Sequence, residues 1–416
     1  MSSFAALQLA SPIITALTDL GYAAPTPIQA QAIPAILAGK DVLAGAQTGT
    51  GKTAAFALPL LTRLLEGQPA QSKHPHALIL APTRELADQV ATSIQGYAAH
   101  TKLQTLAVYG GVSQRPQTDA LTQGVDILVA TPGRLLDLIN QQALELSAVR
   151  WLILDEADRM LDLGFKDELV RLLKRLPKQR QTLFFSATFP KSVKDLAYSM
   201  LNQPEEIAVA AANATLDSIE QVLYNMDTSK KRPALAWLIG SGNWQQVLIF
   251  VRSKKQADDL ASELLKDGIK CDSLHGDKSQ GARARALDDF KNGKIRALIA
   301  TDVAARGIDI IELPWVVNYE LPFNAEDYVH RIGRTGRAGN SGKAISFVAR
   351  NEENLLADIE ALIKRPLPTQ WLIGFEPNFD DPADSASHGR NQRKQRQKAK
   401  AKAKSQATYG IKKSRS

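Results

Sequence analysis

The sequence predicts an α/β protein that consists of two parallel-sheet domains in tandem and a disordered basic C-terminal tail. Three observations support this fold class. The chain has 416 residues, which is too long for one ordinary hydrophobic core. Hydrophobic residues make up 44% of the sequence and charged residues 23%, as is typical of globular proteins. Short apolar runs alternate with helical patterns, and their continuous apolar character indicates parallel strands covered on both faces.

The first domain begins with helical patterns at 12–20 and 28–37. A short apolar strand is predicted at 41–44, and a helix follows at 54–65. Pro59 lies inside that helix and is a residue type that kinks helices. The remaining strands of this sheet are predicted at 76–80, 105–108, 126–129, 151–154 and 182–185.

Small polar residues at 210–216 interrupt this rhythm and indicate a linker. The rhythm then restarts, with helices such as 254–266 and 281–290. No residue-level repeat relates the two halves, so a duplicated fold is expected from the rhythm alone. The strands of the second domain are predicted at 246–251, 269–274, 296–300, 315–319 and 344–348. The predicted units are therefore 1–209 for the first domain, 217–379 for the second and 380–416 for the tail.

The positive charge of the protein belongs to its tail. The formal net charge is +8, but residues 390–416 hold 11 Lys and Arg and no Asp or Glu. Residues 1–389 therefore carry 40 of the 51 basic side chains against 43 acidic ones. The tail has few large apolar residues, so it cannot bury a core and should be disordered when free. It is either a solubility segment or a non-specific tether for nucleic acid.

Several classes of protein do not fit the composition. Cys271 is the single cysteine, which excludes an intrachain disulfide and fits a reducing compartment. No Cys/His cluster has zinc-binding spacing, and no apolar run reaches membrane-spanning length. The N-terminal sequence MSSFAALQLASPII lacks the basic region of a signal peptide. We therefore expect a cytoplasmic protein.

Residues 46–53, read as AQTGTGKT, are the stretch around which the first domain is organised. Gly49 and Gly51 let the backbone curl so that successive N–H groups point at a phosphate. Lys52 supplies charge for the terminal phosphates, and Thr53 offers a hydroxyl to Mg²⁺. The strand before and the helix after complete a phosphate-binding context, because a helix N-terminus favours anions. The alternative is a flexible surface loop, since alanine replaces the glycine that opens the general pattern.

Two further clusters carry candidate chemistry. Asp155 and Glu156 directly follow the apolar run 151–154. Mg²⁺ keeps several water ligands, so one Asp carboxylate and one Thr hydroxyl are enough ligands from the protein. The adjacent carboxylate of Glu156 can orient or deprotonate the attacking water. In the second domain, Arg334 and Arg337 are suited to stabilise a transferring phosphoryl group from across an interface. The alternatives are an acidic turn that caps a helix and a solvated basic helix end.

Taken in order, these motifs resemble those of the DEAD-box RNA helicases, the superfamily-two ATPases named for a tetrapeptide that here spans Asp155–Asp158. The resemblance runs from Phe4 to about Ala349. GYAAPTPIQ at 21–29 looks like the Q motif of the family, and the loop at 46–53 is similar to its alanine-opening phosphate loop. The other matching segments are PTRELA at 82–87, GG at 110–111, TPGR at 131–134, SAT at 186–188, VRS at 251–253, Gln280 with Arg283, TDVAARGID at 301–309 and HRIGRTGR at 330–337.

The resemblance implies two RecA-like domains, ATP and Mg²⁺ as cofactors, and RNA as the partner. It implies ATP contacts for Phe4, Gln29, Thr48, Gly49, Thr50, Gly51, Lys52, Thr53 and Asp309, and metal contacts for Thr53 and Asp155. The implied catalytic residues are Lys52, Asp155, Glu156, Arg334 and Arg337, and the implied coupling residues are Ser186 and Thr188. RNA contacts are implied for Arg84, Gly111, Thr131, Arg134, Arg252, Arg283, Thr301 and Gly307.

The implied function is an ATP-dependent RNA helicase. Closure of two domains on ATP would bend one RNA strand and expel the other. We expect contacts mainly to phosphates and 2′-hydroxyls, hence little sequence preference. An ATP-gated RNA clamp or annealing chaperone and a DNA-translocating helicase are the alternatives. The segments HGDKSQGARA at 275–284 and NYELP at 318–322 look most like the bacterial RhlE-type branch.

Overall fold

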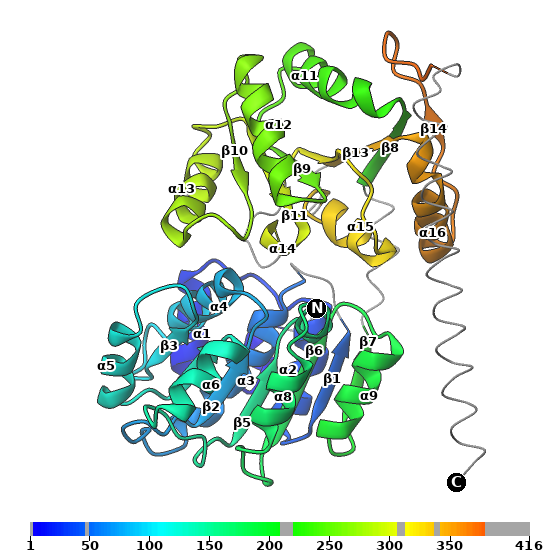
Figure 1. Cartoon of the computed structure of the whole chain (residues 1–416). Helices are drawn as coiled ribbons and strands as arrows, with labels where there is room; N and C mark the ends of the chain where they lie inside the picture. Colours follow the sequence, from blue (N-terminus) through cyan, green and yellow to red (C-terminus); the bar gives the residue numbers. More distant parts are fainter. Residues whose placement is uncertain (1–2, 46–49, 209–218, 306–312, 337–341, 379–416) are drawn as a thin grey trace, which may run out of the picture.

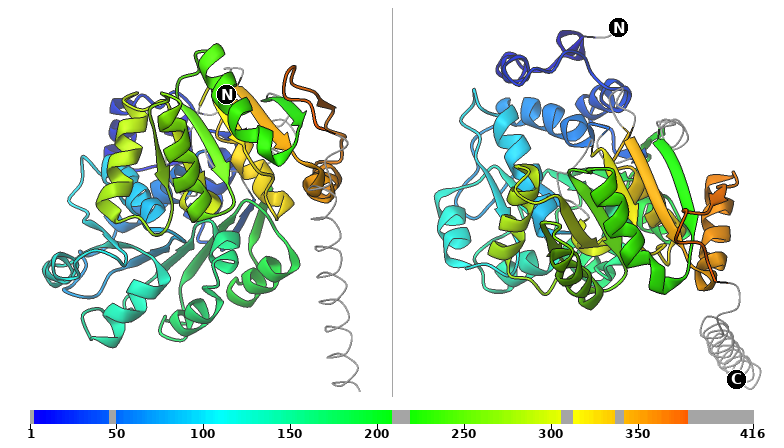
Figure 2. Two further views of the ribbon diagram at one scale, coloured as in Figure 1. Left: turned by 45° about the horizontal axis from the view of Figure 1, so that its top comes forward. Right: turned by 90° about the horizontal axis from the view of Figure 1, so that it is seen from above.

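The computed structural model of the chain describes residues 3–45, 50–208, 219–305, 313–336 and 342–378 (Figure 1). The described chain forms two domains, and each is a seven-stranded parallel sheet with helices packed on its faces (Figure 1 and Figure 2). This arrangement confirms the predicted fold class. The predicted features that lie outside the described residues are the linker at 210–216, the tail, Thr48, Gly49, Gly307, Asp309 and Arg337.

The first domain holds strands β1 to β7. Its elements are η1 (a 3₁₀ helix, Phe4–Leu7), α1 (Ser11–Asp19), α2 (Pro27–Leu37), β1 (Val42–Gly45), α3 (Lys52–Leu65), β2 (Ala77–Leu80), α4 (Arg84–Tyr97), β3 (Thr105–Val108), α5 (Arg115–Gln123), β4 (Ile127–Ala130), α6 (Pro132–Asn140), β5 (Trp151–Leu154), α7 (Ala157–Asp162), α8 (Lys166–Leu173), β6 (Gln181–Ser186), α9 (Lys191–Met200) and β7 (Glu205–Ala208).

The second domain holds strands β8 to β14. Its elements are β8 (Ile219–Asn225), η2 (Thr228–Lys230), α11 (Lys231–Ser241), β9 (Val247–Val251), α12 (Lys254–Lys266), β10 (Cys271–Leu274), α13 (Gln280–Lys291), β11 (Ala297–Thr301), α14 (Asp302–Ala305), β12 (Trp315–Asn318), α15 (Ala325–Ile332), β13 (Gly342–Val348), η3 (Arg350–Glu352), α16 (Glu353–Ile363) and β14 (Thr369–Gln370).

Both sheets have the same strand order. The first runs β3-β4-β2-β5-β6-β1-β7, and the second runs β10-β11-β9-β12-β13-β8-β14. Counted within its own domain, each order reads 3-4-2-5-6-1-7, so the duplicated fold expected from the sequence rhythm is confirmed. All the ladders between these strands are parallel, which requires a crossover after each strand and accounts for the helices between them.

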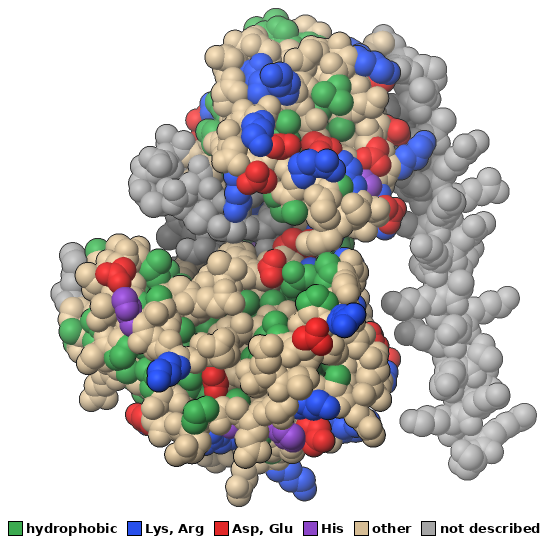
Figure 3. Space-filling view, turned by 90° about the vertical axis from the view of Figure 1, so that its left-hand side faces the viewer, with side chains coloured by type: hydrophobic (Ala, Val, Ile, Leu, Met, Phe, Trp, Pro, Cys, Tyr) green, Lys and Arg blue, Asp and Glu red, His purple; other side chains and the backbone are tan. Residues whose placement is uncertain are grey.

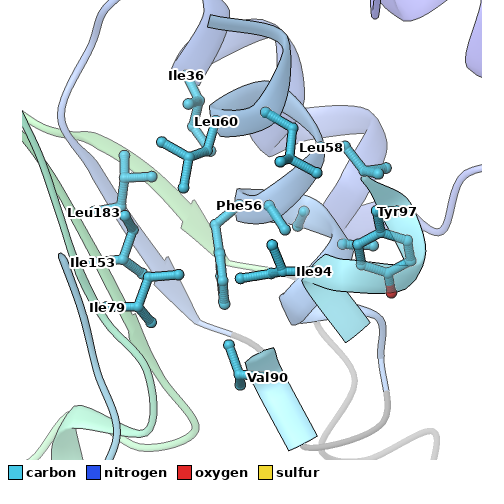
Figure 4. Packing of buried hydrophobic residues seen from close by; sticks show 14 of the residues in the cluster. Ile36, Phe56, Leu58, Leu60, Ile79, Val90, Ile94, Tyr97, Ile153 and Leu183 are labelled. Atoms are coloured by element: carbon cyan, nitrogen blue, oxygen red, sulfur yellow. The ribbon is translucent and has the colours of Figure 1, made fainter. Parts of the chain in front are cut away.

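The core of the first domain lies on both faces of its sheet, because the central strands are buried on both sides. On one face Phe56 of α3 packs beside Ile79, Ile153 and Leu183 (Figure 4). Its ring also meets that of Phe185 edge-on, with 5.3 Å between centroids. Truncating a fully buried phenylalanine costs about 3–5 kcal/mol. This packing therefore fixes α3, and with it the phosphate-loop residues at the start of the helix, against the sheet.

The apolar runs predicted most of the strands, with ends that differ by one or two residues. The runs at 105–108 and 151–154 coincide with β3 and β5. The strands β7, β8 and β14 were not predicted. β7 and β14 are edge strands with mostly exposed residues, and most residues of β8 are only partly buried. None of the three has the continuous apolar run that marks a central parallel strand.

The helices also follow their predictions. α12 has the predicted bounds, and α3 begins at Lys52, two residues earlier than expected. Pro59 lies inside α3 without ending it. Within the described ranges, no helix combines the length and the apolar composition that a membrane crossing requires.

Candidate functional site

A cavity of about 660 Å³ lies between the two domains. From the first domain it is lined by the start of α3, one face of α4 and the residues that follow β5. From the second domain it is lined by α13 and by Arg334, which follows α15. Its volume is within the range of small-molecule sites. Figure 3 shows basic and acidic side chains interspersed on the second domain near its boundary with the first.

Strand order brings the two predicted halves of the phosphate site together. β1 leads to Lys52 and β5 leads to Asp155, and both strands pair with β6 in parallel. Their carboxyl ends therefore lie at the same edge of the sheet, although Lys52 and Asp155 are 103 positions apart in the sequence. Lys52, Thr53 and Asp155 all line the cavity, as the sequence predicted.

Gly51 and Gln29 form the wall behind Lys52. The Gln29 amide nitrogen donates to the Gly51 carbonyl oxygen at 3.1 Å, and its oxygen accepts from the Thr26 N–H at 2.9 Å. Gly51 has φ of +89°, and a Cβ at this position would lie 2.3 Å from the Gln29 amide nitrogen. Conformation and space therefore both require glycine here. Gln29 also belongs to a capping box that begins α2, so the Q-motif residue is built into a helix start.

Lys52 and Asp155 each carry a buried polar atom that lacks a partner. Lys52 is 6% exposed and Asp155 is 2% exposed. Within the described part of the chain, neither the Lys52 Nζ nor the Asp155 Oδ1 has a hydrogen-bond partner. Burial raises the pKa of Asp155 to about 6, against the opposing charge of Lys52. Buried groups of this kind are costly unless a ligand satisfies them, so both atoms are suited to a phosphate and its metal ion.

Glu156 and Arg334 line the same cavity from opposite domains. Glu156 caps α7 with φ of +51° and ψ of 52°, a left-handed conformation that is uncommon for residues other than glycine. Such strain at the end of a strand is typical of functional sites. Arg334 is 5% exposed. The fold therefore brings together the candidate base and the candidate arginine finger, as the sequence predicted.

The predicted coupling residues Ser186 and Thr188 are bound to Asp158. The Asp158 Oδ2 accepts hydrogen bonds from the N–H and hydroxyl groups of Thr188, both at 2.9 Å. The Ser186 hydroxyl accepts from the Asp158 N–H at 3.3 Å and donates to the Thr188 carbonyl oxygen at 2.8 Å. Burial raises the pKa of Asp158, but the charges of nearby His330, Lys52 and Arg159 outweigh this effect, and the net shift is downward. Asp158 therefore remains ionised and holds this turn.

The domains also meet through ion pairs that the sequence analysis did not identify. Arg159 of α7 contacts Asp327 of α15 at 2.7 Å and also the His330 ring. Arg283 of α13 contacts Glu85 of α4 at 2.7 Å. Partners this far apart in the chain leave no local pattern, although each lies inside or beside a recognised motif. Arg283 also lines the cavity, and its predicted contact with RNA stays a prediction.

The other predicted RNA residues of the first domain are close together. A Cβ on Gly111 would lie 1.9 Å from the Arg84 guanidinium, so Arg84 packs directly on this glycine. Arg134 donates to the Val112 carbonyl oxygen at 3.2 Å. Thr131 caps α6 at the end of β4, next to β2, which leads to Arg84. These motifs therefore form one surface at the carboxyl ends of β2 and β4.

The remaining predicted residues are held within their own domains. Arg252 donates to the Leu321 carbonyl oxygen at 2.6 Å and pairs with Glu352. Thr301 ends β11 and is buried. Phe4 is buried behind Tyr22, with ring centroids 6.2 Å apart, and Tyr22 lines the cavity.

Comparison with known proteins agrees with this geometry. A family described as DEAD/DEAH box helicase matches residues 26–196, and one described as Helicase conserved C-terminal domain matches residues 230–339. RNA helicase CrhR of Synechocystis is 46% identical over 88% of this chain and 74% of the relative. DEAD-box ATP-dependent RNA helicase CshA of Bacillus subtilis is 40% identical over 91% of this chain and 75% of the relative. ATP-dependent RNA helicase DeaD of Escherichia coli K12 is 43% identical over 90% of this chain, which spans only 59% of that relative.

Solved structures give the same result. Saccharomyces cerevisiae Dbp5 bound to RNA and ADP BeF3 has a TM-score of 0.81 and 34% identity, covering 93% of this chain and 98% of that one. A DEAD box protein from the hyperthermophile Methanococcus jannaschii has a TM-score of 0.51 and 40% identity, covering 88% and 99%. The family matches cover both domains and include every residue that lines the cavity except Tyr22. This chain therefore belongs to the DEAD/DEAH box helicase family.

Proposed function

We propose that this protein is an ATP-dependent RNA helicase that couples ATP binding and hydrolysis to local unwinding of RNA or to remodelling of RNA–protein complexes. The observation that carries the proposal is the pair of buried atoms, Lys52 Nζ and Asp155 Oδ1, in a cavity that Arg334 lines from the other domain. A triphosphate with its metal ion would satisfy both atoms and bridge the two domains. The names of the relatives support RNA as the polymer.

The residues of the cavity have distinct proposed roles. Lys52 binds the terminal phosphates, and Gln29 reads the adenine edge, since an amide can donate and accept toward this base. Thr53 and Asp155 would hold Mg²⁺, which is suited to oxygen ligands and needs few of them from the protein. When bound, Mg²⁺ supplies positive charge beside the phosphates. Glu156 orients or deprotonates the attacking water.

Arg334, together with Arg337, stabilises the charge of the transferring phosphoryl group from the second domain. An arginine suits this position because its planar fork can bond two oxygens at once. Thr48, Gly49, Thr50 and Gly51 would contribute backbone N–H groups to the phosphates, and Asp309 would contact the ribose. Phe4 would act on the base through the aromatic wall that includes Tyr22.

In this proposal, domain closure is the step that couples ATP binding to RNA binding. The likeness to Dbp5 bound to RNA and ADP BeF3 extends over 93% of this chain, which supports a closed arrangement of the two domains. Arg84, Gly111, Thr131 and Arg134 would bind the RNA backbone on the first domain, and Arg252, Arg283, Thr301 and Gly307 would bind it on the second. Ser186 and Thr188 would transmit the state of the ATP site to RNA through Asp158.

The proposed division of the chain is a first domain at 1–209, a linker at 210–216, a second domain at 217–379 and a tail at 380–416. The tail would bind RNA without sequence preference, because its 11 basic residues lack acidic neighbours. A cytoplasmic location is supported by the bacterial relatives. Membership of the RhlE-type branch stays a prediction.

One experiment separates this function from its alternatives. ATP hydrolysis is measured for the wild type and for Lys52→Ala with no polymer, with single-stranded RNA and with single-stranded DNA. We expect RNA to stimulate the wild type strongly, DNA to have little effect, and Lys52→Ala to be inactive in all three conditions. Equal stimulation by DNA would favour a DNA motor, and wild-type turnover by Lys52→Ala would remove the phosphate-loop assignment.

A second measurement separates unwinding from clamping. A short RNA duplex is incubated with protein and ATP, and strand release is compared with retention of single-stranded RNA. The helicase releases a strand on each productive closure. ATP-dependent retention of RNA without strand release would favour the RNA clamp or annealing chaperone instead.

A further inference from the structure

The guanidinium of Arg159 joins the two domains and at the same time has a partner on its own helix. Its Nη1 atom lies 2.7 Å from the Asp327 Oδ1 in the second domain and 3.2 Å from the Asp162 Oδ2 one turn further along α7. The side chain is only 5% exposed, whereas those of Asp327 and Asp162 are 13% and 45% exposed. The interdomain pair is therefore largely buried, and the intrahelical pair is open to water.

The two helices that this ion pair joins each lead to a candidate catalytic residue. α7 begins directly after Glu156, and Arg159 lies three positions further along. α15 contains Asp327 and ends at Ile332, two positions before Arg334. Both Glu156 and Arg334 line the cavity. Because each helix is short and stiff, the separation between α7 and α15 sets the separation between the candidate base and the candidate arginine finger.

α15 is also held within its own domain. Arg331, on the same helix, binds Asp302 through two nitrogens at 2.6 and 2.7 Å and is 1% exposed. α15 is thus anchored in the second domain by Arg331 and attached to the first domain by Asp327. A displacement of α7 relative to α15 would then move the whole second domain rather than one side chain.

Domain opening would separate Arg159 from Asp327. Breaking a buried ion pair is strongly unfavourable when it leaves one charge without a partner. Asp162 removes this obstacle, because it stays beside Arg159 on α7 in any arrangement of the domains. Arg159 therefore has an exposed partner, Asp162, in every arrangement of the domains, and a buried partner, Asp327, only when the domains are together. Such an interdomain contact can form and break reversibly.

We propose that Arg159 is a positioning residue that exchanges between Asp162 in the open protein and Asp327 in the closed one, and that this exchange sets Arg334 against the ATP site. The inference rests on the proposed function, since it concerns closure of the same cavity. It predicts opposite effects for the two aspartates. Loss of Asp327 removes the carboxylate partner of the closed state and leaves only the His330 ring on α15, whereas loss of Asp162 removes the carboxylate that pairs with Arg159 on its own helix.

The test compares Asp327→Asn, Asp162→Asn and a matched control, Arg232→Ala. Arg232 pairs with Asp267 at 2.6 Å on the outside of the second domain, within one domain. Truncating one partner of a buried charge pair is strongly unfavourable, so we expect Asp327→Asn to lower the kcat of RNA-stimulated ATP hydrolysis about 30-fold or more. The KM for ATP should change less than about threefold, because ATP first binds the first domain.

Asp162→Asn should keep kcat near the wild-type value and tighten RNA binding in the presence of ADP BeF3. An exposed pair is worth about 0.2–1 kcal/mol, which corresponds to an affinity gain of roughly 1.5- to 5-fold. Arg232→Ala should match the wild type in both measurements. Thermal unfolding of all variants checks that each one folds.

Closure itself is measured by energy transfer between dyes on two introduced cysteines, Lys174→Cys and Lys255→Cys. Lys174 is exposed directly after α8 in the first domain, and Lys255 is exposed on α12 in the second. Cys271 does not interfere, because burial raises the pKa of its thiol to about 12 and leaves almost no reactive thiolate at neutral pH. With RNA and ADP BeF3, Asp327→Asn should populate the closed state less than the wild type, and Asp162→Asn should populate it at least as much.

The proposal is overturned if Asp327→Asn folds, closes and hydrolyses ATP like the wild type, or if both aspartate variants shift RNA affinity in the same direction. Failure of the proposed function has a different signature. In that case the wild type itself shows no stimulation by RNA, and none of the variants differs from it.

Discussion

The side-chain amide of Gln29 donates a hydrogen bond to the carbonyl oxygen of Gly51 at 3.1 Å, 22 residues further along the chain. The contact ties the start of α2 to the residue that precedes the buried Lys52. It leaves no space for a side chain on Gly51. The residues around Gln29 and the residue before Lys52 are therefore directly connected, and we expect a change at one to affect the other.

Gly51→Ala should raise the KM for ATP about tenfold or more. The added Cβ would lie 2.3 Å from the Gln29 amide nitrogen, so Gln29 must move, and the φ of +89° is unfavourable for alanine by roughly 1–2 kcal/mol. Gly39→Ala is the matched control, because Gly39 has φ of +77° with nothing within 4 Å of an added Cβ. The control should lose stability but keep its KM. Equal KM values for ATP in both variants would show that the contact with Gln29 does not affect the phosphate loop.

Asp155→Asn should stabilise the ligand-free protein while preventing catalysis. Burial raises the folded-state pKa of Asp155 to about 6, above its ordinary value of 3.8, so the folded protein binds the extra proton between these values. The free energy of unfolding therefore falls by up to about 3 kcal/mol as the pH rises through this window, and this loss persists at pH 7.5. Asparagine carries no charge and avoids this cost. Thermal unfolding at pH 7.5 without ligand measures the gain, and an unchanged or lower Tm would contradict it.

The same pKa predicts how ATP binding depends on pH. Only the ionised carboxylate of Asp155 can bind Mg²⁺, so affinity for Mg²⁺ and ATP should weaken as the pH falls below about 6. Titration of a fluorescent ATP analogue with Mg²⁺ between pH 5 and 8 measures this dependence. It should be absent without Mg²⁺, where phosphate contacts to Lys52 dominate.

Glu156→Gln should bind ATP and RNA but hydrolyse ATP about 10²–10⁴ times more slowly, because an amide cannot accept the proton of the attacking water. The variant should accumulate as a long-lived complex with RNA and ATP. Single-turnover hydrolysis and RNA dissociation rates measure the two effects. Fast release of RNA in the presence of ATP would remove Glu156 from its proposed role.

Arg334→Ala should lower kcat about 10³-fold, which is the usual contribution of an arginine finger, with a much smaller loss of ATP affinity. The reason is that Arg334 reaches the cavity from the second domain and acts fully only on closure. Arg232→Ala is the matched surface control. Steady-state hydrolysis at saturating RNA gives kcat, and a kcat equal to that of the wild type would exclude Arg334 from the site.

Deletion of residues 385–416 should raise the KM for RNA and flatten its dependence on salt, while kcat at saturating RNA stays within about twofold. Each phosphate that the tail neutralises releases counterions, with a slope of about −0.7 per contact on single strands. RNA-stimulated hydrolysis at low and moderate salt measures both parameters for the two forms. Equal KM values and equal slopes would identify the tail as a solubility segment.

Local sequence determined the strands and the phosphate loop, because these features depend on neighbouring residues. A continuous apolar run indicates a strand that is buried on both faces. The glycines and Lys52 within the eight residues 46–53 indicate a phosphate-binding loop. Edge strands carry no such run, so β7 and β14 became visible only in the folded sheet. The resemblance to a family then supplied residue roles that composition and spacing alone do not contain.

Tertiary structure decided how these local features meet. The parallel strand order joins Lys52 to Asp155, and domain packing joins Arg159 to Asp327 across 168 positions. It also pairs Arg283 with Glu85 at the cavity wall. Such pairs have no sequence period, because an ion pair between domains depends on two surfaces that fold separately. The chemistry of each side chain follows from its residue type, but the partner that it contacts depends on how the whole chain packs.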